Sequence, residues 1–142
     1  MKYEELSEKI IKSFYNVYNT LGYGFLEKVY ENAMMLDLRK AGLKCENQVP
    51  IKVIYQKETI GEYFADILVE NKIIIELKAI KQLTKQDEAQ LLNYLSSTKI
   101  EVGLLLNFGK KPEIKRKIFD NKLKKYNALR LTDEHRKTRI KK

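Results

Sequence analysis

The chain has 142 residues, 44% of them hydrophobic, and a formal net charge of +9, which predicts one domain, residues 1–125, followed by a basic tail, residues 126–142. Its single cysteine and single histidine exclude a disulfide framework and a zinc site built from these two residue types. No apolar run approaches the roughly 18 residues of a membrane span, so we expect a cytoplasmic protein without a membrane partner.

Two amphipathic helices are predicted at the amino end. In residues 2–19 the apolar side chains recur at helical spacing, and the stripe consists of Leu6, Ile10, Phe14, Val17 and Leu21. A second helix is expected over residues 25–40, because Gly42 can close it. The expected buried stripe of this second helix consists of Leu26, Val29, Ala33 and Met34.

The middle of the chain predicts strands. Residues 45–55 alternate in polarity and form the first strand, and residues 56–61 are expected to turn into the next one. Two apolar runs, residues 63–69 and 73–80, follow and are joined by a tight polar turn at residues 70–72. Gln48, near the start of the first strand, is expected to cap a hydrogen-bond network.

The last third of the domain combines helices and one strand. Thr84 with Asp87 resembles a capping box at the start of a helix over residues 85–96. A buried strand is expected over residues 102–107. A final helix is expected over residues 114–125, with three side chains facing inward: Ile118, Phe119 and Leu123.

The positive charge is concentrated at the carboxyl end. Residues 110–142 hold 14 lysines and arginines against four acidic residues, whereas residues 1–109 hold 14 against 15. Such a segment attracts the phosphate backbone of nucleic acid, and a solvated tail explains it equally well. The single histidine, His135, lies in this segment and is expected to be a bystander.

Three charged side chains, Asp66, Glu76 and Lys78, interrupt the two apolar runs. Glu76 and Lys78 are two residues apart on one strand and share a face. A three-residue turn at residues 70–72, or a bulge near Asp66, would place Asp66 opposite Glu76, whereas a two-residue turn would send it to the other face. We therefore predict the three-residue turn or the bulge.

Two carboxylates that face each other across a strand pair are costly. Like charges 4 Å apart repel by roughly 4 kcal/mol at an effective dielectric constant near 20. A divalent cation between the carboxylates reverses the sign of this energy, and oxygen ligands of this kind favour Mg²⁺ or Mn²⁺. The pattern therefore predicts a metal site.

The same residues resemble a known signature. Asp66 and the run Glu76-Leu77-Lys78 look like the motif of the PD-(D/E)xK nuclease superfamily, although the proline of its name is replaced by Ala65. Residues 24–30 match the motif of the GxxExxY family, a branch of that superfamily, and residues 88–95 and 102–109 also resemble its blocks. The resemblance covers about residues 21–118. It implies an α/β fold with a restriction-endonuclease-like core, in which helices flank a mixed sheet of four to five strands and two helices lie at the amino end.

The resemblance implies metal-dependent hydrolysis of phosphodiester bonds in nucleic acid, DNA more than RNA, with Mg²⁺ or Mn²⁺ as cofactor. Lys78 would hold the attacking water or stabilise the developing charge, and Gln90 would position Lys78 or the water. A homodimer is possible, because cutting a duplex commonly takes two copies. The expected metal ligands are Asp66, Glu76, the Leu77 carbonyl and Glu27, and the expected catalytic residues are Asp66, Glu76, Lys78, Glu27 and Gln90.

Several alternatives stay open. The domain could bind nucleic acid without cutting it, or Lys78 could neutralise both carboxylates in a structural ion-pair cluster. Glu27 could be a first-turn acid favoured by the helix dipole, and Gln90 a surface amide. Tyr30 could be a core residue with its hydroxyl on an active-site carboxylate, and a role for Tyr94 is open. The strand form of the substrate is not indicated.

Overall fold

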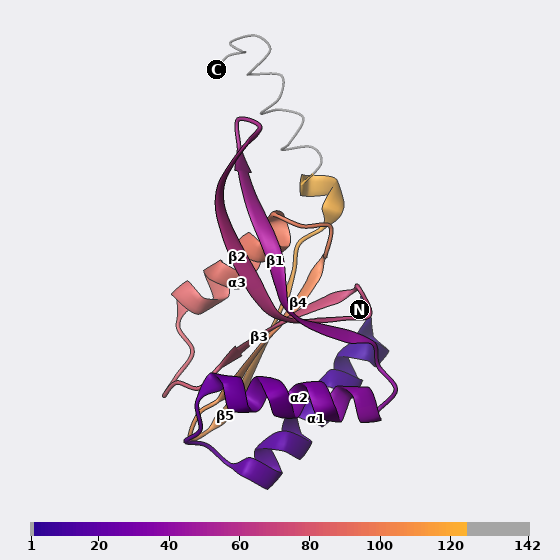
Figure 1. The fold of residues 1–142 in the computed structure, drawn as a ribbon, viewed down its shortest axis with the longest axis vertical. Helices are drawn as coiled ribbons and strands as arrows, with labels where there is room; N and C mark the ends of the chain where they lie inside the picture. The colour runs from indigo at the N-terminus through magenta and orange to yellow at the C-terminus, as the bar shows by residue number, and fades with distance from the viewer. Residues whose placement is uncertain (1, 125–142) are drawn as a thin grey trace.

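The computed structural model describes residues 2–124 (Figure 1), so the basic tail at residues 126–142 and His135 lie outside the described residues. The elements in chain order are α1 (Glu4–Leu21), α2 (Glu27–Lys40), β1 (Cys45–Tyr55), β2 (Glu58–Val69), β3 (Ile73–Lys78), α3 (Lys85–Ser96), β4 (Val102–Phe108) and β5 (Pro112–Ile118). Within residues 2–124, none of the helices is long and apolar enough to span a membrane.

The five strands form one mixed sheet in the order β1-β2-β3-β4-β5. β3 and β4 are parallel, and the other neighbours are antiparallel. One cluster of buried apolar residues joins α1 and α2 to one face of the sheet, and a second cluster joins α3 to the other face. The predicted α/β architecture, with a mixed sheet, flanking helices and two helices at the amino end, is confirmed.

The core under α1 and α2 is partly aromatic. The ring of Tyr30 stacks on Phe108 at 4.1 Å between centroids, and Phe14 contacts the same ring edge-on at 4.7 Å. This packing fixes the rotation of α2, because it turns Tyr30 toward the sheet. The predicted stripe of α2 is therefore wrong at two positions: Leu26 is 80% exposed and Val29 is also exposed. The buried residues of α2 are Tyr30, Glu31, Met34, Met35 and Leu38.

The segment after β4 forms a strand where a helix was predicted. β5 pairs with the whole of β4, from Val102 opposite Ile118 to Phe108 opposite Pro112. This pairing satisfies the outer backbone groups of β4, which a helix at residues 114–125 would leave open. Of the segment predicted to be a helix, the described part contains a helical turn only at residues 121–124. Ile118 and Leu123 are exposed instead of facing inward.

The hairpin of β1 and β2 is longer than predicted. Its turn contains only Gln56 and Lys57, both with positive φ (50° and 68°), and β2 already begins at Glu58. In Figure 1 the tip of this hairpin projects away from α1 and α2.

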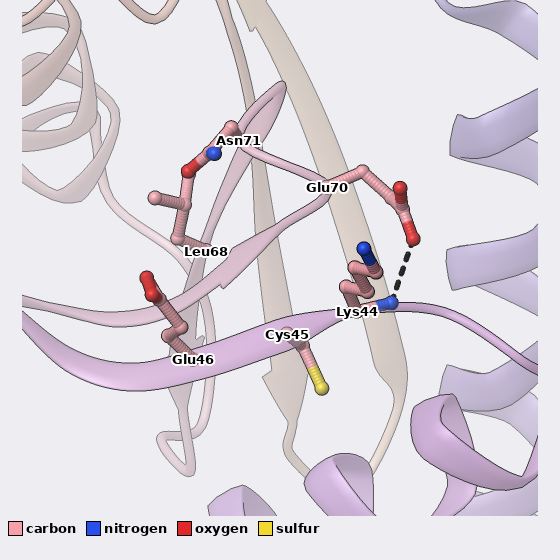
Figure 2. Close-up of a pocket in the computed structure, with 6 residues that line it drawn as sticks. All are labelled: Lys44, Cys45, Glu46, Leu68, Glu70 and Asn71. Atoms are coloured by element: carbon pink, nitrogen blue, oxygen red, sulfur yellow. Dashed lines mark hydrogen bonds between the residues drawn. The ribbon is translucent and has the colours of Figure 1, made fainter.

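The turn between β2 and β3 has the predicted three residues. Val69 lies opposite Ile73, and Glu70 and Asn71 have positive φ. The Glu70 carboxylate accepts a hydrogen bond from the Lys44 backbone N–H at 2.6 Å, as Figure 2 shows in the pocket beside the turn. The start of β1 is thus tied to this turn.

Candidate active site

The candidate site lies where the regular pairing of β2 with β3 ends. The last regular pair is Ile67 opposite Ile75. One position further, the Asp66 N–H donates to the Glu76 Oε1 at 3.2 Å, and the Leu77 N–H donates to the Asp66 Oδ2 at 2.7 Å. Each carboxylate therefore takes the place of a backbone carbonyl as acceptor, and both carboxylates lie in the same gap between the strands.

Both acids are partly or fully removed from water. Glu76 is only 6% exposed, and its burial, together with the negative charge of Asp66, raises the pKa of its carboxyl to about 8. Burial also raises the pKa of Asp66, and the charges of Glu31 and Glu27 add to this effect against the hydrogen bond from Leu77. The ionised pair is unfavourable in this gap unless a cation compensates it.

Lys78 forms no ion pair with Asp66 or Glu76. Its Nζ lies 4.0 Å from the Asp87 Oδ1, in the first turn of α3. Among the described residues, no lysine or arginine nitrogen comes within 4.0 Å of the Asp66 or Glu76 carboxylate. The ion-pair cluster considered above is therefore absent from this part of the chain, although the charge of Lys78 does lower the pKa of both acids.

The end of β3 that carries Lys78 is held by Asn107. This buried amide accepts from the Ile80 N–H at 3.0 Å and donates to the Ile80 carbonyl at 2.9 Å. A β-carbon on Gly109 would collide with the same Ile80 carbonyl oxygen, so glycine allows this close approach. The stretch Val102–Gly109 thus fixes the chain direction two residues after Lys78.

The helix α3 covers the site from the side of Lys78. The predicted capping box between Thr84 and Asp87 is present and sets the start of the helix. Gln90 lies one turn further and lines the same groove as Lys78. The structure thus brings Gln90 into the neighbourhood where the sequence placed it.

Tyr30 does not contact the acids. Its hydroxyl donates to the Gly22 carbonyl at 2.6 Å and accepts from the Phe25 N–H at 3.2 Å. These bonds hold the loop before α2, from which Glu27 emerges as the first residue of the helix. Through these bonds Tyr30 fixes the loop that precedes Glu27.

Glu27 is exposed, yet its charge raises the pKa of both Asp66 and Glu76. Across residues 2–124, however, no three side chains of acidic residues, cysteine or histidine gather closely enough to hold a metal ion. The structure brings two of the predicted side-chain ligands, Asp66 and Glu76, together at one gap, and leaves Glu27 exposed at the start of α2.

Glu31 is the residue that the sequence analysis missed. It is 4% exposed and accepts hydrogen bonds from Lys28 (3.0 Å), Asn47 (2.9 Å) and Gln48 (2.7 Å). Burial works to raise its pKa, but the three donors outweigh burial and lower it. The signal in the sequence was an acid on the apolar stripe of α2, three residues before Met34 and seven before Leu38.

Gln48 connects this acid to the site. Its Nε2, which donates to Glu31, also lies 3.5 Å from the Asp66 Oδ1, and its backbone has a φ of 52°. The prediction that Gln48 caps a hydrogen-bond network is confirmed. The network contacts the Asp66 oxygen Oδ1, whereas Leu77 donates to the other oxygen, Oδ2.

Comparisons with known proteins bear on the family and on the fold. The chain matches the model of the PD-(D/E)XK nuclease superfamily over residues 4–117, while a comparison with proteins of curated function finds no match. A solved structure described as the crystal structure of SSO0001 superposes with a TM-score of 0.50 at 15% identity, covering 73% of this chain and 56% of that one. At this identity the likeness concerns the fold alone, and this chain spans little more than half of that protein. Because the family match runs from α1 into β5 over a restriction-endonuclease-like sheet, this chain belongs to the PD-(D/E)XK nuclease superfamily.

Proposed function

We propose that the protein is a metal-dependent nuclease of the GxxExxY type that hydrolyses phosphodiester bonds of nucleic acid, DNA before RNA. The observation that carries the proposal is the pair Asp66 and Glu76. Two carboxylates share one gap between strands, one of them is almost fully buried, and no cationic side chain of residues 2–124 lies within 4.0 Å. Such a pair is suited to a divalent cation.

The donor set fits Mg²⁺ or Mn²⁺, because every candidate ligand is an oxygen. Asp66 and Glu76 would hold the ion, the Leu77 carbonyl is the candidate for a third protein ligand, and Glu27 would complete the shell directly or through water. When bound, such an ion polarises the phosphate and lowers the pKa of a coordinated water.

The chain's own residues supply the remaining functions. Lys78, on the same face of β3 as Glu76, would hold the attacking water or stabilise the negative charge that develops on the phosphate. Gln90, across the groove on α3, would position Lys78 or the water. The carboxyl of Glu76, with its pKa of about 8, must lose its proton to bind a cation, so cation affinity should rise with pH up to about that value.

The basic carboxyl end supplies attraction for the nucleic acid backbone that does not depend on base sequence. A homodimer would be needed if both strands of a duplex are cut together. The matched superfamily supports a nucleic acid as substrate.

Cleavage of supercoiled plasmid and of single-stranded DNA in MgCl₂, MnCl₂ or EDTA tests this function. We expect cleavage with either metal, none in EDTA, and a loss of roughly a thousandfold or more, about 4 kcal/mol in the barrier, in Asp66→Asn and Glu76→Gln. Glu46→Gln, which makes the same change at an exposed position of β1, serves as matched control and should retain activity.

Two outcomes would contradict the proposal. Cleavage that persists in both site variants would assign the activity to another site or to a contaminant. Binding of nucleic acid without cleavage under every metal condition would leave the alternative, a non-cleaving binding module that retains the nuclease fold.

A further inference from the structure

A groove of about 680 Å³ lies between α3 and the β1–β2 hairpin, and α3 crosses the hairpin in the view of Figure 1. Tyr63 of β2 and Tyr94 of α3 belong to its wall, and Lys78 lies in its lining. Because Lys78 follows Glu76 by two residues on the same face of β3, the groove opens directly beside the candidate active site. In the nuclease function proposed above, only Gln90 and Lys78 of this groove have a role: Gln90 would position Lys78 or the attacking water.

The two tyrosines of the groove differ in exposure. Their ring centroids lie 5.7 Å apart with an interplanar angle of 42°, and Tyr94 is buried to 7% exposure behind Tyr63, which is 49% exposed. Tyr63 therefore presents an aromatic surface that is held in place by the ring behind it. Stacking of a nucleobase on such a ring contributes about 1–3 kcal/mol of binding free energy.

The α3 side of the groove also carries amides. Gln86, Gln90 and Asn93 follow each other at steps of four and three residues on α3, so they share one face of the helix, and all three line the groove. A side-chain amide has both donors and an acceptor, as the edges of nucleobases do. The wall can therefore form hydrogen bonds with the edge of a base that is stacked on Tyr63.

The groove is close to electrically neutral. Of its lining residues in the described chain, only Lys78 and Asp87 are charged, and these two lie 4.0 Å apart at the end next to the active site. A channel for the phosphate backbone would need several unpaired basic groups. The lining suits an uncharged ring, with the attached phosphate at the end where Lys78 lies.

We propose that this groove binds an unpaired nucleobase next to the scissile phosphate, so that the substrate is single-stranded nucleic acid or the single-stranded arm of a branched one. A base inside a duplex is stacked on both faces and paired along its edge, so it cannot offer a free face to Tyr63. The proposal rests on the nuclease function for the position of the phosphate, but base binding can be measured without cleavage.

Binding in EDTA provides the first test. Fluorescence anisotropy compares a labelled single strand with a labelled blunt duplex of the same sequence, for the wild type, Tyr63→Leu and Tyr63→Phe. We expect Tyr63→Leu to weaken single-strand binding about 5- to 150-fold, the equivalent of one lost stacking contact, and to leave duplex binding unchanged. Tyr63→Phe keeps the ring and should bind like the wild type.

Tyr55→Leu is the matched control, because Tyr55 is similarly exposed near the tip of the same hairpin but does not line the groove. Thermal unfolding of each variant confirms that the fold is retained. An equal loss of single-strand and duplex binding in Tyr63→Leu, or an equal loss in Tyr55→Leu, would overturn the proposal, since the tyrosine would then contribute general affinity.

Photocrosslinking tests the contact directly and does not depend on any variant. A single strand with one 5-iodouracil is bound to the wild type in EDTA, irradiated, and the attached peptide is identified by mass spectrometry. We expect the base on the peptide that contains Tyr63 or on the α3 peptide that contains Tyr94. Crosslinks confined to peptides outside the groove would overturn the proposal.

The failure of this proposal can be told apart from failure of the nuclease function. If the single strand binds through Tyr63 but is not cleaved in any metal, the nuclease function is wrong and the base site stands. If Asp66-dependent cleavage occurs, but duplex is cut as well as single strand and Tyr63→Leu cuts both normally, the base site is wrong and the nuclease function stands.

Discussion

The two ends of the β2–β3 pair belong to the same strands but differ in their backbone pairing and in the character of their side chains. At the turn end, Val69 lies opposite Ile73, both side chains are fully buried, and the backbone pairing is regular. At the far end, Asp66 and Glu76 occupy the same relative positions, and their carboxylates accept the backbone N–H groups of the opposing strand. Where the regular pairing ends, the two carboxylates act as acceptors for the backbone N–H groups of the opposing strand.

The two ends of the strand pair contribute differently to the stability of the fold. The turn end contributes to folding through the burial of apolar surface. The open end opposes folding when it is ionised, as the pKa of about 8 for the Glu76 carboxyl indicates. The apolar packing at the turn end therefore supports the two buried acids at the other end of the same strands.

Removing packing at the turn end should have the largest effect on stability. We expect Ile73→Ala to lower the free energy of unfolding by about 2–5 kcal/mol, measured by urea denaturation, with cleavage per folded molecule unchanged. Ile60→Ala, at an exposed position of β2, should change stability by less than about 0.5 kcal/mol. If Ile73→Ala lost activity while fully folded, the separation between the two ends would be wrong.

The pH dependence of the free energy of unfolding reports on the Glu76 carboxyl at the open end of the strand pair. Because the folded protein raises the pKa of Glu76 from its ordinary value of 4.5 to about 8, protonation of Glu76 favours folding. This contribution is fully present below pH 4.5 and is lost as the pH rises through about 8, with a slope of at most about 1.4 kcal/mol per pH unit. Urea denaturation in EDTA between pH 5 and 8 measures it.

Glu76→Gln is the control for that slope, because glutamine keeps the size of the side chain and cannot ionise. The decline of stability with pH should flatten in this variant, and Mg²⁺ should stabilise the wild type more at pH 8 than at pH 5, since it binds the ionised acid. The lowered pKa of Glu31 affects stability only at lower pH. An unchanged slope in Glu76→Gln would assign the titration to another group.

A smaller effect is expected from the network that holds Asp66. Gln48→Met removes the amide between Glu31 and Asp66 but keeps the length of the side chain, and we expect cleavage to fall about tenfold with little change in stability. Gln56→Met is the matched control, because Gln56 has the same left-handed backbone (φ 50°) at the exposed tip of the hairpin. Equal activity of the two variants in a metal-dependent cleavage assay would remove Gln48 from the site.

The smallest effect should come from the turn itself. Glu70→Ala removes the acceptor of the Lys44 N–H (Figure 2), and we expect a loss of about 1 kcal/mol in the free energy of unfolding without a change in cleavage. Glu46→Ala, at an exposed residue of the same pocket, should be close to neutral. A drop in the cleavage rate of Glu70→Ala would show that the two ends are coupled.

Much of the scaffold was predictable from the sequence. The helix of residues 4–21, the strand of residues 45–55 and the capping box at Thr84 follow from patterns within a few residues. The three-residue turn at residues 70–72 was predictable because, without a bulge near Asp66, only that length brings the two charged residues of the neighbouring strands to the same side. The hydrogen bonds at Asp66 and Glu76 are consistent with that reasoning.

Other features depended on partners far away in the sequence. The strand at Pro112–Ile118 forms because β4 offers it an open edge, and the rotation of α2 follows from the stacking of Tyr30 on Phe108. The pairing that sets Asp66 opposite Glu76 could be read from the chain alone, since register is a property of neighbouring segments. The burial of Glu31 and the groove at Tyr63 follow only from the assembled fold, because burial and concavity arise where elements distant along the chain meet.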